Sequence, residues 1–408
     1  MLNIKFIREN PEVIKQGCRA KQVEVDIDKL LELDGKKREH LKEIERLRAE
    51  QNKLGRDQIK EAQEIKNKIK TLEPELNELD RTINSLILQI PNLPLKDVPP
   101  GEDESNNIEL KKEGTSPQFN FPVKDYLEIA ESLDLIDVRR AAKITGTRFG
   151  FLRNEAVLLE FALINLAFDT LTKEGFIPII SPVMLKPEMA KGMGYPEQFD
   201  GEEAYYIEKD NLFLIGTSEQ SMGAMHANET FAEKDLPKRY VGFSTCFRRE
   251  AGSYGKDTKG IFRVHQFDKV EMFSFSKPED SRKEHQFLLK MEENLMKKLK
   301  ISYRLLQMCT GDLGFPAAAK YDIEAWMPSE NRYRETHSTS NCTDFQSRRL
   351  NIRYKKKDGS LDFVHTLNGT AFAVGRTLIA IIENYQQKDG SVKVPKILQK
   401  YLKFKTVS

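Results

Sequence analysis

Residues 247–275 read FRREAGSYGKDTKGIFRVHQFDKVEMFSF. This stretch predicts two β-strands joined by a basic loop, with Arg263, Phe267 and Glu271 each four positions apart. Because side chains alternate faces along a strand, these three are expected to point to the same side. A cation, an aromatic ring and a carboxylate in one row suit a ligand that carries phosphate, base and ammonium groups. ATP together with an amino acid is such a ligand.

The simpler interpretation of this stretch is a solvated sheet face, because alternating charges on a strand usually face water. Apolar residues are nevertheless interleaved with the charges, namely Ile261, Val264, Phe267, Val270 and Phe273. The strand is too apolar for a free surface and too charged for a core. It therefore favours the floor of a half-buried ligand site.

The same stretch resembles motif 2 of the class II aminoacyl-tRNA synthetases, and RVHQFDKVEMF (263–273) resembles the version found in bacterial-type seryl-tRNA synthetases. HTLNGTAFAVGRTLIAIIENYQ (365–386) resembles motif 3, and GFIPIISPVML (175–185), after an expected helix around 154–173, resembles motif 1 with its proline at Pro182. The resemblance covers nearly the whole chain. It implies an α+β fold: a class II antiparallel β-sheet core flanked by helices, with an N-terminal antiparallel α-helical coiled-coil arm. It also implies a serine–tRNA ligase, and motif 1 implies a homodimer.

Length, charge and cysteine spacing exclude several classes of protein. A chain of 408 residues is long enough for two or three domains. It has no run of eighteen apolar residues, and its N-terminus lacks the apolar region of a secretory signal, so we expect no membrane contact and a cytosolic location. The four cysteines are widely spaced, which indicates neither a disulfide framework nor a zinc finger. Because the net charge is only +2, any contact with nucleic acid must come from local basic patches.

Residues 27–90 predict two amphipathic helices that fold back on each other. Apolar residues recur at intervals of three and four on both sides of Leu54-Gly55-Arg56-Asp57, which predicts a helix stop and a turn. Pro74 is expected to bend the second helix. PNLPLKDVPPGEDESNN (91–107) predicts an extended linker without regular structure. We therefore expect an N-terminal domain at 1–105 and a catalytic domain at 106–408.

The arm alone would favour a dimerisation rod. Next to a synthetase core, the resemblance implies instead that it contacts the long variable arm of tRNA(Ser), and charging of tRNA(Sec) is left open. Basic residues near the tip are the candidate phosphate contacts, namely Lys53, Arg56, Lys60, Lys66, Lys68 and Lys70.

Activation of serine brings its carboxylate onto the α-phosphate of ATP, so the site must hold two anions together. Arginine suits this task because its fork binds carboxylate and phosphate oxygens bidentately. Arg248 is the candidate bridge between the two groups, and Arg263 and Arg376 are the further catalytic candidates. A structural arginine paired with a surface acid is the alternative for each.

The resemblance assigns the remaining ATP contacts. Phe267 would stack on adenine with Arg376 over its other face, and Glu250 would accept from the adenine amino group, unless it forms a surface ion pair with Arg249. Glu335 is the candidate Mg²⁺ ligand, because Mg²⁺ prefers oxygen. Thr336 and His337 depart from the usual Glu-Ile-Ser-Ser, and His337 is expected to be structural. The candidate ATP-binding residues are Arg248, Arg249, Glu250, Arg263, Val264, Phe267, Glu335, Thr336, His337, Ser338 and Arg376.

The resemblance also assigns a serine pocket. Glu219 of the Thr-x-Glu loop and Glu271 would neutralise the ammonium group and bond the hydroxyl group, and Thr370 stands where the family usually has serine. The candidate serine-binding residues are Thr217, Ser218, Glu219, Arg248, Glu271, Asn368 and Thr370.

Two other functions compete with this one. A ligase that charges a carrier protein would resemble the catalytic core but lack the long arm, which residues 27–90 argue against. A catalytically inactive, tRNA-binding paralogue would not need the candidate arginines and acids.

Overall fold

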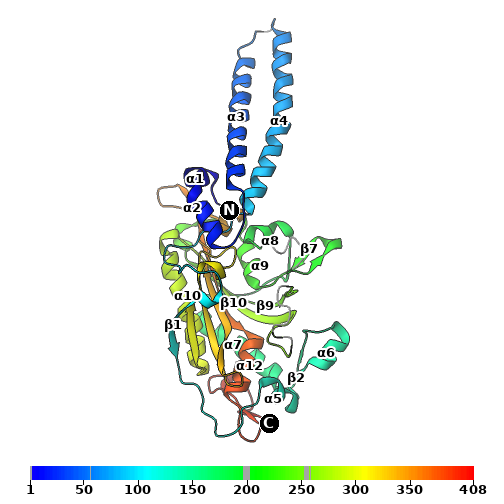
Figure 1. Cartoon of the computed structure of the whole chain (residues 1–408), viewed down its shortest axis with the longest axis vertical. Helices are drawn as coiled ribbons and strands as arrows, with labels where there is room; N and C mark the ends of the chain where they lie inside the picture. Colours follow the sequence, from blue (N-terminus) through cyan, green and yellow to red (C-terminus); the bar gives the residue numbers. More distant parts are fainter. Residues whose placement is uncertain (1, 56, 196–202, 252–256, 258) are drawn as a thin grey trace. The chain divides into compact units, whose positions relative to one another are not determined.

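The computed structural model describes residues 2–55, 57–195, 203–251, 257 and 259–408. The chain forms two compact units, Met1–Leu93 and Pro94–Ser408 (Figure 1). The two compact units divide between Leu93 and Pro94. The boundary between an N-terminal and a catalytic domain after residue 105 stays a prediction.

The first unit is helical. Its long helix α3 begins after Asp26, whose side chain accepts from the Lys29 amide at 2.8 Å and so satisfies an otherwise unpaired helix-end donor. The turn that follows α3 contains Leu54 and Gly55 as predicted, whereas Arg56 lies outside the described residues. The helix after the turn runs through Pro74. The helices of this unit are α1 (Ile4–Glu9), α2 (Pro11–Ala20), α3 (Ile27–Gln51) and α4 (Ile59–Leu88).

Helices α3 and α4 form the predicted antiparallel hairpin (Figure 1). Cross-helix ion pairs show the direction, because the partners run in opposite order along the two helices: Lys37 with Asp80, His40 with Glu75, and Arg48 with Glu73. Between them lies an apolar seam, with Ile44, Leu47 and Ile69 buried in its outer part. The expected helical arm is confirmed.

The segment after Leu93 lacks helices and strands until Glu104, as predicted, but it is fixed to the second unit. The Leu95 amide donates to the Ala318 carbonyl at 2.8 Å, and the Thr310 amide donates to the Pro99 carbonyl at 2.9 Å. Val98 is buried in a small apolar cluster with Leu306 and Met308. The linker is thus extended and irregular, and its backbone groups and its valine find partners on the second unit.

The second unit is built on a twisted sheet. Within the described residues this sheet has eight strands. Each neighbouring pair of strands is antiparallel except β4 and β9, which are parallel. In spatial order the strands are β1 (Ile108–Glu113), β11 (Tyr303–Gln307), β12 (Ala319–Met327), β13 (Arg332–Asn341), β16 (His365–Ala373), β10 (Gln266–Ser276), β9 (Lys238–Phe247) and β4 (Ile177–Ile180). This confirms the predicted antiparallel core.

Helices cover both faces of this sheet. On β10, Val270 and Met272 enter the larger core with α7 (Glu155–Leu171), α10 (Ser281–Leu299) and α12 (Val374–Asn384). Phe273 and Phe275 point the other way, into a core with α8 (Pro187–Met193), α9 (Ser218–Ala224) and α11 (Phe345–Leu350). Because side chains alternate, Lys269 and Glu271 share the face of the second core.

The remaining elements are short. Helices α5 (Tyr126–Ser132) and α6 (Val138–Thr145) precede α7, and the small sheets are β2 (Ile136–Asp137) with β3 (Phe151–Leu152), β5 (Met184–Leu185) with β7 (Leu212–Leu214) and β6 (Tyr206–Ile207), β8 (Thr230–Ala232) with β14 (Arg353–Lys355) and β15 (Leu361–Phe363), and β17 (Val392–Lys393) with β18 (Thr406–Val407). Among the helices that the structure describes, none combines the length and apolar character needed to span a bilayer.

One prediction about the opening stretch was wrong. β9 ends at Phe247 and β10 begins at Gln266, so Arg263 lies in the connection and not in the strand. The ladder closes where the Arg248 amide donates to the His265 carbonyl at 2.9 Å, and the chain leaves the sheet between these residues. Arg263 therefore reaches the site by loop geometry and not by strand alternation.

Candidate active site

A pocket at the ends of β9 and β10 gathers most of the candidate ATP residues. It lies between the β9–β10 connection, the middle of β13 and the start of α12. It is lined by Arg248, Glu250, Ile261, Phe262, Arg263, Val264, Phe267, Lys269, Glu335, Thr336, Thr370, Ala373, Gly375 and Arg376. The three candidate catalytic arginines thus face one cavity.

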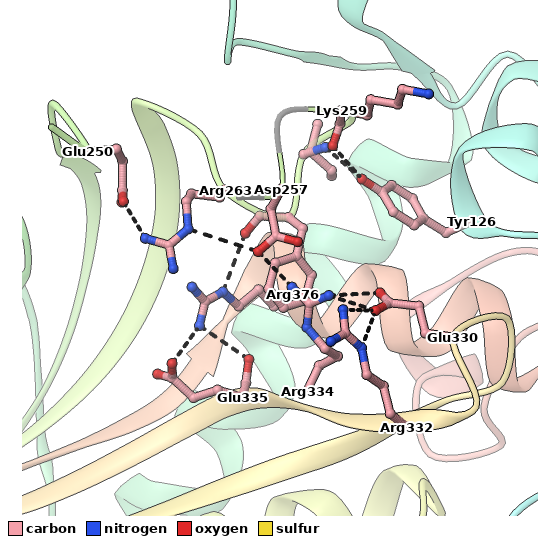
Figure 2. Close-up of polar contacts among 12 residues, drawn as sticks. Tyr126, Glu250, Asp257, Lys259, Arg263, Glu330, Arg332, Arg334, Glu335 and Arg376 are labelled. Carbon is pink, nitrogen blue, oxygen red and sulfur yellow. Dashed lines mark hydrogen bonds and ion pairs between the residues drawn. The ribbon is translucent and has the colours of Figure 1, made fainter. Parts of the chain in front are cut away.

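Two of these arginines are held by the acids that the sequence assigns to other roles (Figure 2). Arg263 donates from one terminal nitrogen to Glu250 Oε2 at 2.6 Å, and Arg376 lies 3.2 Å from Glu335 Oε2. The ion pair considered between Glu250 and Arg249 is replaced by this Arg263 pair. Arg249 instead lies over the ring of Tyr205, at 5.9 Å from its centre.

Aromatic rings lie beside three of the arginines around the pocket. Arg248 lies over Phe267, with its guanidinium carbon 5.2 Å from the ring centre, whereas Arg376 lies over Phe262 at 4.8 Å. Arg334 also lies over Phe262, at 3.8 Å. Arg376 Nε donates to the Phe262 carbonyl at 3.4 Å. The expectation that Arg376 covers the other face of an adenine stacked on Phe267 stays a prediction.

A β-bulge at Thr336 decides which residues of the Glu-Thr-His-Ser segment face the pocket. Glu335 pairs with Glu324 and His337 pairs with Ile323, so Thr336 is the extra residue on β13. Because of this insertion Glu335 and Ser338 fall on the same face, although they are three apart. His337 points to the other face, where it is fully buried and its ring meets Phe372 edge-on. His337 thus has a structural side chain and does not line the pocket.

Glu335 is ionised at neutral pH. Partial burial opposes ionisation, but the positive charges of Arg376, Lys320 and Arg248 lower the pKa of the Glu335 carboxyl to about 2. Its side chain remains 47% exposed, so its oxygens stay accessible to a ligand. Among the described residues, no cluster of three or more Asp, Glu, His or Cys side chains forms a ready-made metal site.

The candidate serine residues meet at a second, buried centre next to this pocket. Lys269, only 8% exposed, forms an ion pair with Glu271 and donates to the Thr217 hydroxyl at 3.2 Å. The Thr370 hydroxyl lies 3.5 Å from Glu271 Oε2. A bulge at Ala371 sets this contact, because Glu271 pairs with Thr370 while Val270 pairs with Phe372.

Burial also shapes the ionisation of Glu271. Removal from water raises the pKa of its carboxyl to about 7, with Lys269 opposing the rise and the negative charge of Glu219 adding to it. Ser218, Glu219 and Asn368 are buried nearby on α9 and β16, and Glu219 is bonded by Tyr195 and Gln346.

Sequence reasoning missed several residues of the site. Lys269 could have been predicted. Strand alternation places residue 269 on the same face as residues 267 and 271, which the sequence did single out. Phe262 and Arg334 carried no comparable signal, since their position depends on the fold of a loop. Tyr195 and Gln346 come from distant segments and were equally invisible.

Comparison with known proteins agrees with this arrangement. Residues 1–94 match the seryl-tRNA synthetase N-terminal domain, and residues 204–385 match the class II tRNA synthetase core domain (G, H, P, S and T). The chain is 46% identical to the serine–tRNA ligase of Dictyoglomus turgidum over 98% of both chains. Its structure is similar to that of the Pyrococcus horikoshii seryl-tRNA synthetase complexed with ATP, with a TM-score of 0.94 and 42% identity over 100% of this chain and 99% of the other. It is also similar to a cytoplasmic serine–tRNA ligase from Naegleria fowleri in complex with AMP, with a TM-score of 0.92 and 36% identity over 100% and 99% of the two chains.

The antiparallel sheet, with its bulges at Thr336 and Ala371, and the arginine-lined pocket define a class II aminoacyl-tRNA synthetase core. With the helical arm and the full-length matches, the chain belongs to the seryl-tRNA synthetase family.

Gly369 gives a test of how tightly the floor of this site is packed. A Cβ at this position would lie 3.0 Å from Glu292 Oε1 and 3.1 Å from Thr339 Oγ1. We expect Gly369→Ala to lower the free energy of unfolding by about 1–3 kcal/mol through overpacking, measured by urea denaturation. Gly375→Ala is the control, because its nearest contact is an ordinary 3.8 Å to the Ile261 carbonyl oxygen. Equal stability of the two variants would contradict the close packing behind β16.

Proposed function

We propose that this chain is a serine–tRNA ligase, which forms seryl-adenylate and pyrophosphate from serine and ATP and then transfers serine to the terminal adenosine of tRNA(Ser). The observation that carries the proposal is the pocket in which Arg248, Arg263 and Arg376 converge beside the buried Lys269–Glu271 centre. A triphosphate and an amino acid can meet where these two centres join.

In the first step a serine carboxylate oxygen attacks the α-phosphorus of ATP, the bond to the β-phosphate bridging oxygen breaks, and pyrophosphate leaves. Serine enters as a carboxylate, so no protein base is needed. Arg248 lies at the junction, with its Nε fixed by the Gly216 carbonyl at 3.1 Å and its plane over Phe267. From there its guanidinium would hold the carboxylate and the α-phosphate and stabilise the charge of the transition state.

Arg263 and Arg376 would hold the remaining phosphate charge. Each is paired with an acid, so neither cation is left uncompensated in the pocket. The buried Nε of Arg263 makes no hydrogen bond among the described residues, and Asp257 Oδ2 lies 4.0 Å from it, so a phosphate oxygen would compete with this acid for the donor. Glu250 would accept from the adenine amino group, Phe267 would stack on the ring, and Val264 would complete the adenine wall.

The ionised and accessible carboxylate of Glu335 fits a magnesium ion bound to the triphosphate, and Ser338 shares its face. Bound there, Mg²⁺ would neutralise phosphate charge as pyrophosphate forms.

The Lys269–Glu271 centre would select serine. Thr217, Glu271 and Thr370 present oxygen atoms to the ammonium and hydroxyl groups, with Glu219 nearby. A site built to bond a hydroxyl rejects alanine strongly, because its own polar groups would otherwise stay unpaired.

The arm would contact the tRNA. Of its candidate lysines, those at 53, 60, 66, 68 and 70 are all exposed. They would meet phosphates and read the shape of the long variable arm. Charging assays with tRNA(Ser) and tRNA(Sec) would show whether the second tRNA is charged as well. The cytosolic location stays a prediction.

A homodimer is part of the proposal. β4 is one of the two edge strands that the described residues give the large sheet, and its Ile180 is 82% exposed; on α7, Phe161 is 57% exposed. Large apolar side chains beside an open sheet edge fit a surface that a second copy covers.

Serine-dependent exchange of pyrophosphate into ATP tests the activity directly. We expect exchange with serine and not with alanine, because the pocket would bond the side-chain hydroxyl, and not with threonine, whose additional methyl group would have to be excluded by lack of room. The assay follows labelled pyrophosphate entering ATP. Exchange with threonine instead of serine would assign a different specificity.

The raised pKa of Glu271 predicts a pH dependence of serine binding. Only the carboxylate form attracts the ammonium group, so the KM for serine should rise as the pH falls below about 7, approaching ten-fold per pH unit. The Lys269→Met variant should move this rise to higher pH, because Lys269 holds the pKa of Glu271 down. A serine KM that is constant between pH 6 and pH 8 would refute the assignment.

Deletion of Leu33 to Leu86, with a short linker in their place, separates the two steps. We expect pyrophosphate exchange to persist while tRNA charging is lost, because the residues of the site belong to Pro94–Ser408. Charging of tRNAs with and without a long variable arm is measured alongside. Equal loss of both steps would show that the arm is needed for folding.

A further inference from the structure

Glu219 is held by two neutral donors from distant parts of the chain. Its side chain is nearly fully buried at the start of α9. The Tyr195 hydroxyl donates to its Oε2 at 2.7 Å, and the Gln346 amide donates to its Oε1 at 3.0 Å. Each carboxylate oxygen thus has a directed partner.

Both polar atoms of the Gln346 amide form hydrogen bonds within the protein. It is fully buried on α11, and its amide nitrogen also donates to the Met193 carbonyl at 3.1 Å. Its amide oxygen accepts from the Thr366 hydroxyl at 2.6 Å. Because the Met193 carbonyl and the ionised Glu219 carboxylate can only accept, the amide nitrogen must face them, and the amide oxygen is left to accept from Thr366. Thr366 belongs to β16, which also carries Thr370 of the serine pocket, so Gln346 connects that strand to Glu219.

The chemistry of these donors preserves the charge of Glu219. A buried carboxylate needs hydrogen-bond donors, since an unpaired one carries a large desolvation cost. Burial and the negative charge of Glu219 hold the pKa of the Tyr195 phenol well above its usual range, so Tyr195 stays a donor. A phenol and an amide satisfy the carboxylate without cancelling its charge, whereas an arginine or lysine would compete with an ammonium ligand.

We propose that Tyr195 and Gln346 are positioning residues of the serine pocket, which orient the Glu219 carboxylate toward the ammonium group while Thr366 fixes the Gln346 amide. The proposal rests on the proposed function, in which Glu219 takes part in binding serine. Neither residue is assigned a contact with the substrate, and both act through Glu219.

The test measures pyrophosphate exchange by the full-length chain with Tyr195→Phe, Gln346→Met and Thr366→Val. We expect the first two to raise the KM for serine about ten-fold or more, with the KM for ATP and the kcat each within two-fold of the parent. Thr366→Val should also raise the KM for serine, but by less. Thr366→Ser should keep the KM of the parent, because the hydroxyl of the substituted side chain can still donate to Gln346.

Matched variants separate positioning from stability. Tyr303 is buried and donates to Glu293 at 2.7 Å, and Gln386 is buried and donates to the Lys124 carbonyl at 3.1 Å; neither lies in the pocket. Tyr303→Phe and Gln386→Met should lower thermal stability to a similar extent but leave the serine KM unchanged. If Gln346→Met does not fold, the KM for serine of Tyr195→Phe tests the proposal alone, because this substitution removes only one oxygen atom.

The proposal is overturned if Tyr195→Phe and Gln346→Met keep the serine KM of the parent, or if the control variants raise it equally. Failure of the proposed function looks different, because the parent chain would then show no serine-dependent exchange at all.

Discussion

The site depends on charged side chains that are buried in the middle of a β-sheet without being left unpaired. Lys269 and Glu271 lie two residues apart on β10, almost completely removed from water, and an isolated charge in that position would be very costly. The lysine contacts both the carboxylate and the Thr217 hydroxyl, so strand β10 and helix α9 are tied together by the same cation. In the neighbouring pocket, Glu250 and Glu335 compensate the charges of the Arg263 and Arg376 guanidinium groups. A ligand with phosphate, carboxylate and ammonium groups would exchange one set of charge partners for another, and would not have to create the charges in a dry cavity.

Two β-bulges make this arrangement possible. A regular strand would send Glu335 and Ser338 to opposite faces, and the extra residue at Thr336 brings them together. At Ala371 a second insertion lets Thr370 stand opposite Glu271 while Phe372 still enters the core. Each bulge therefore serves packing on one face and chemistry on the other. The insertion at Thr336 also explains why His337, two residues after a candidate metal ligand, is buried against Phe372 with its Nδ1 2.8 Å from the Thr336 hydroxyl.

The sequence predicted the features that repeat or that lie close together in the chain. The helical arm follows from periodic apolar residues, and the antiparallel core and family follow from three long motifs. What sequence reasoning missed depends on contacts between distant segments. The position of Arg263 is set by a loop that leaves the sheet, the bulges are single insertions without a compositional signal, and residues 94–107 are ordered by partners some two hundred positions away. Lys269 is the exception, because alternation alone would have placed it beside Glu271.

The contacts of Glu219 and of Glu271 differ in a way that bears on how the amino acid is recognised. Glu271 has a cationic neighbour and a pKa near neutrality, so its charge is adjustable. Glu219 has neutral donors, so its charge is oriented rather than compensated. Two carboxylates in one buried pocket repel each other, and the negative charge of Glu219 indeed contributes to the raised pKa of Glu271. An ammonium group placed between them would relieve that repulsion and lower the pKa of Glu271. Lys269 already opposes this repulsion at Glu271, and in the proposed function the ammonium group of serine would oppose it further, before any contact with the side-chain hydroxyl is made.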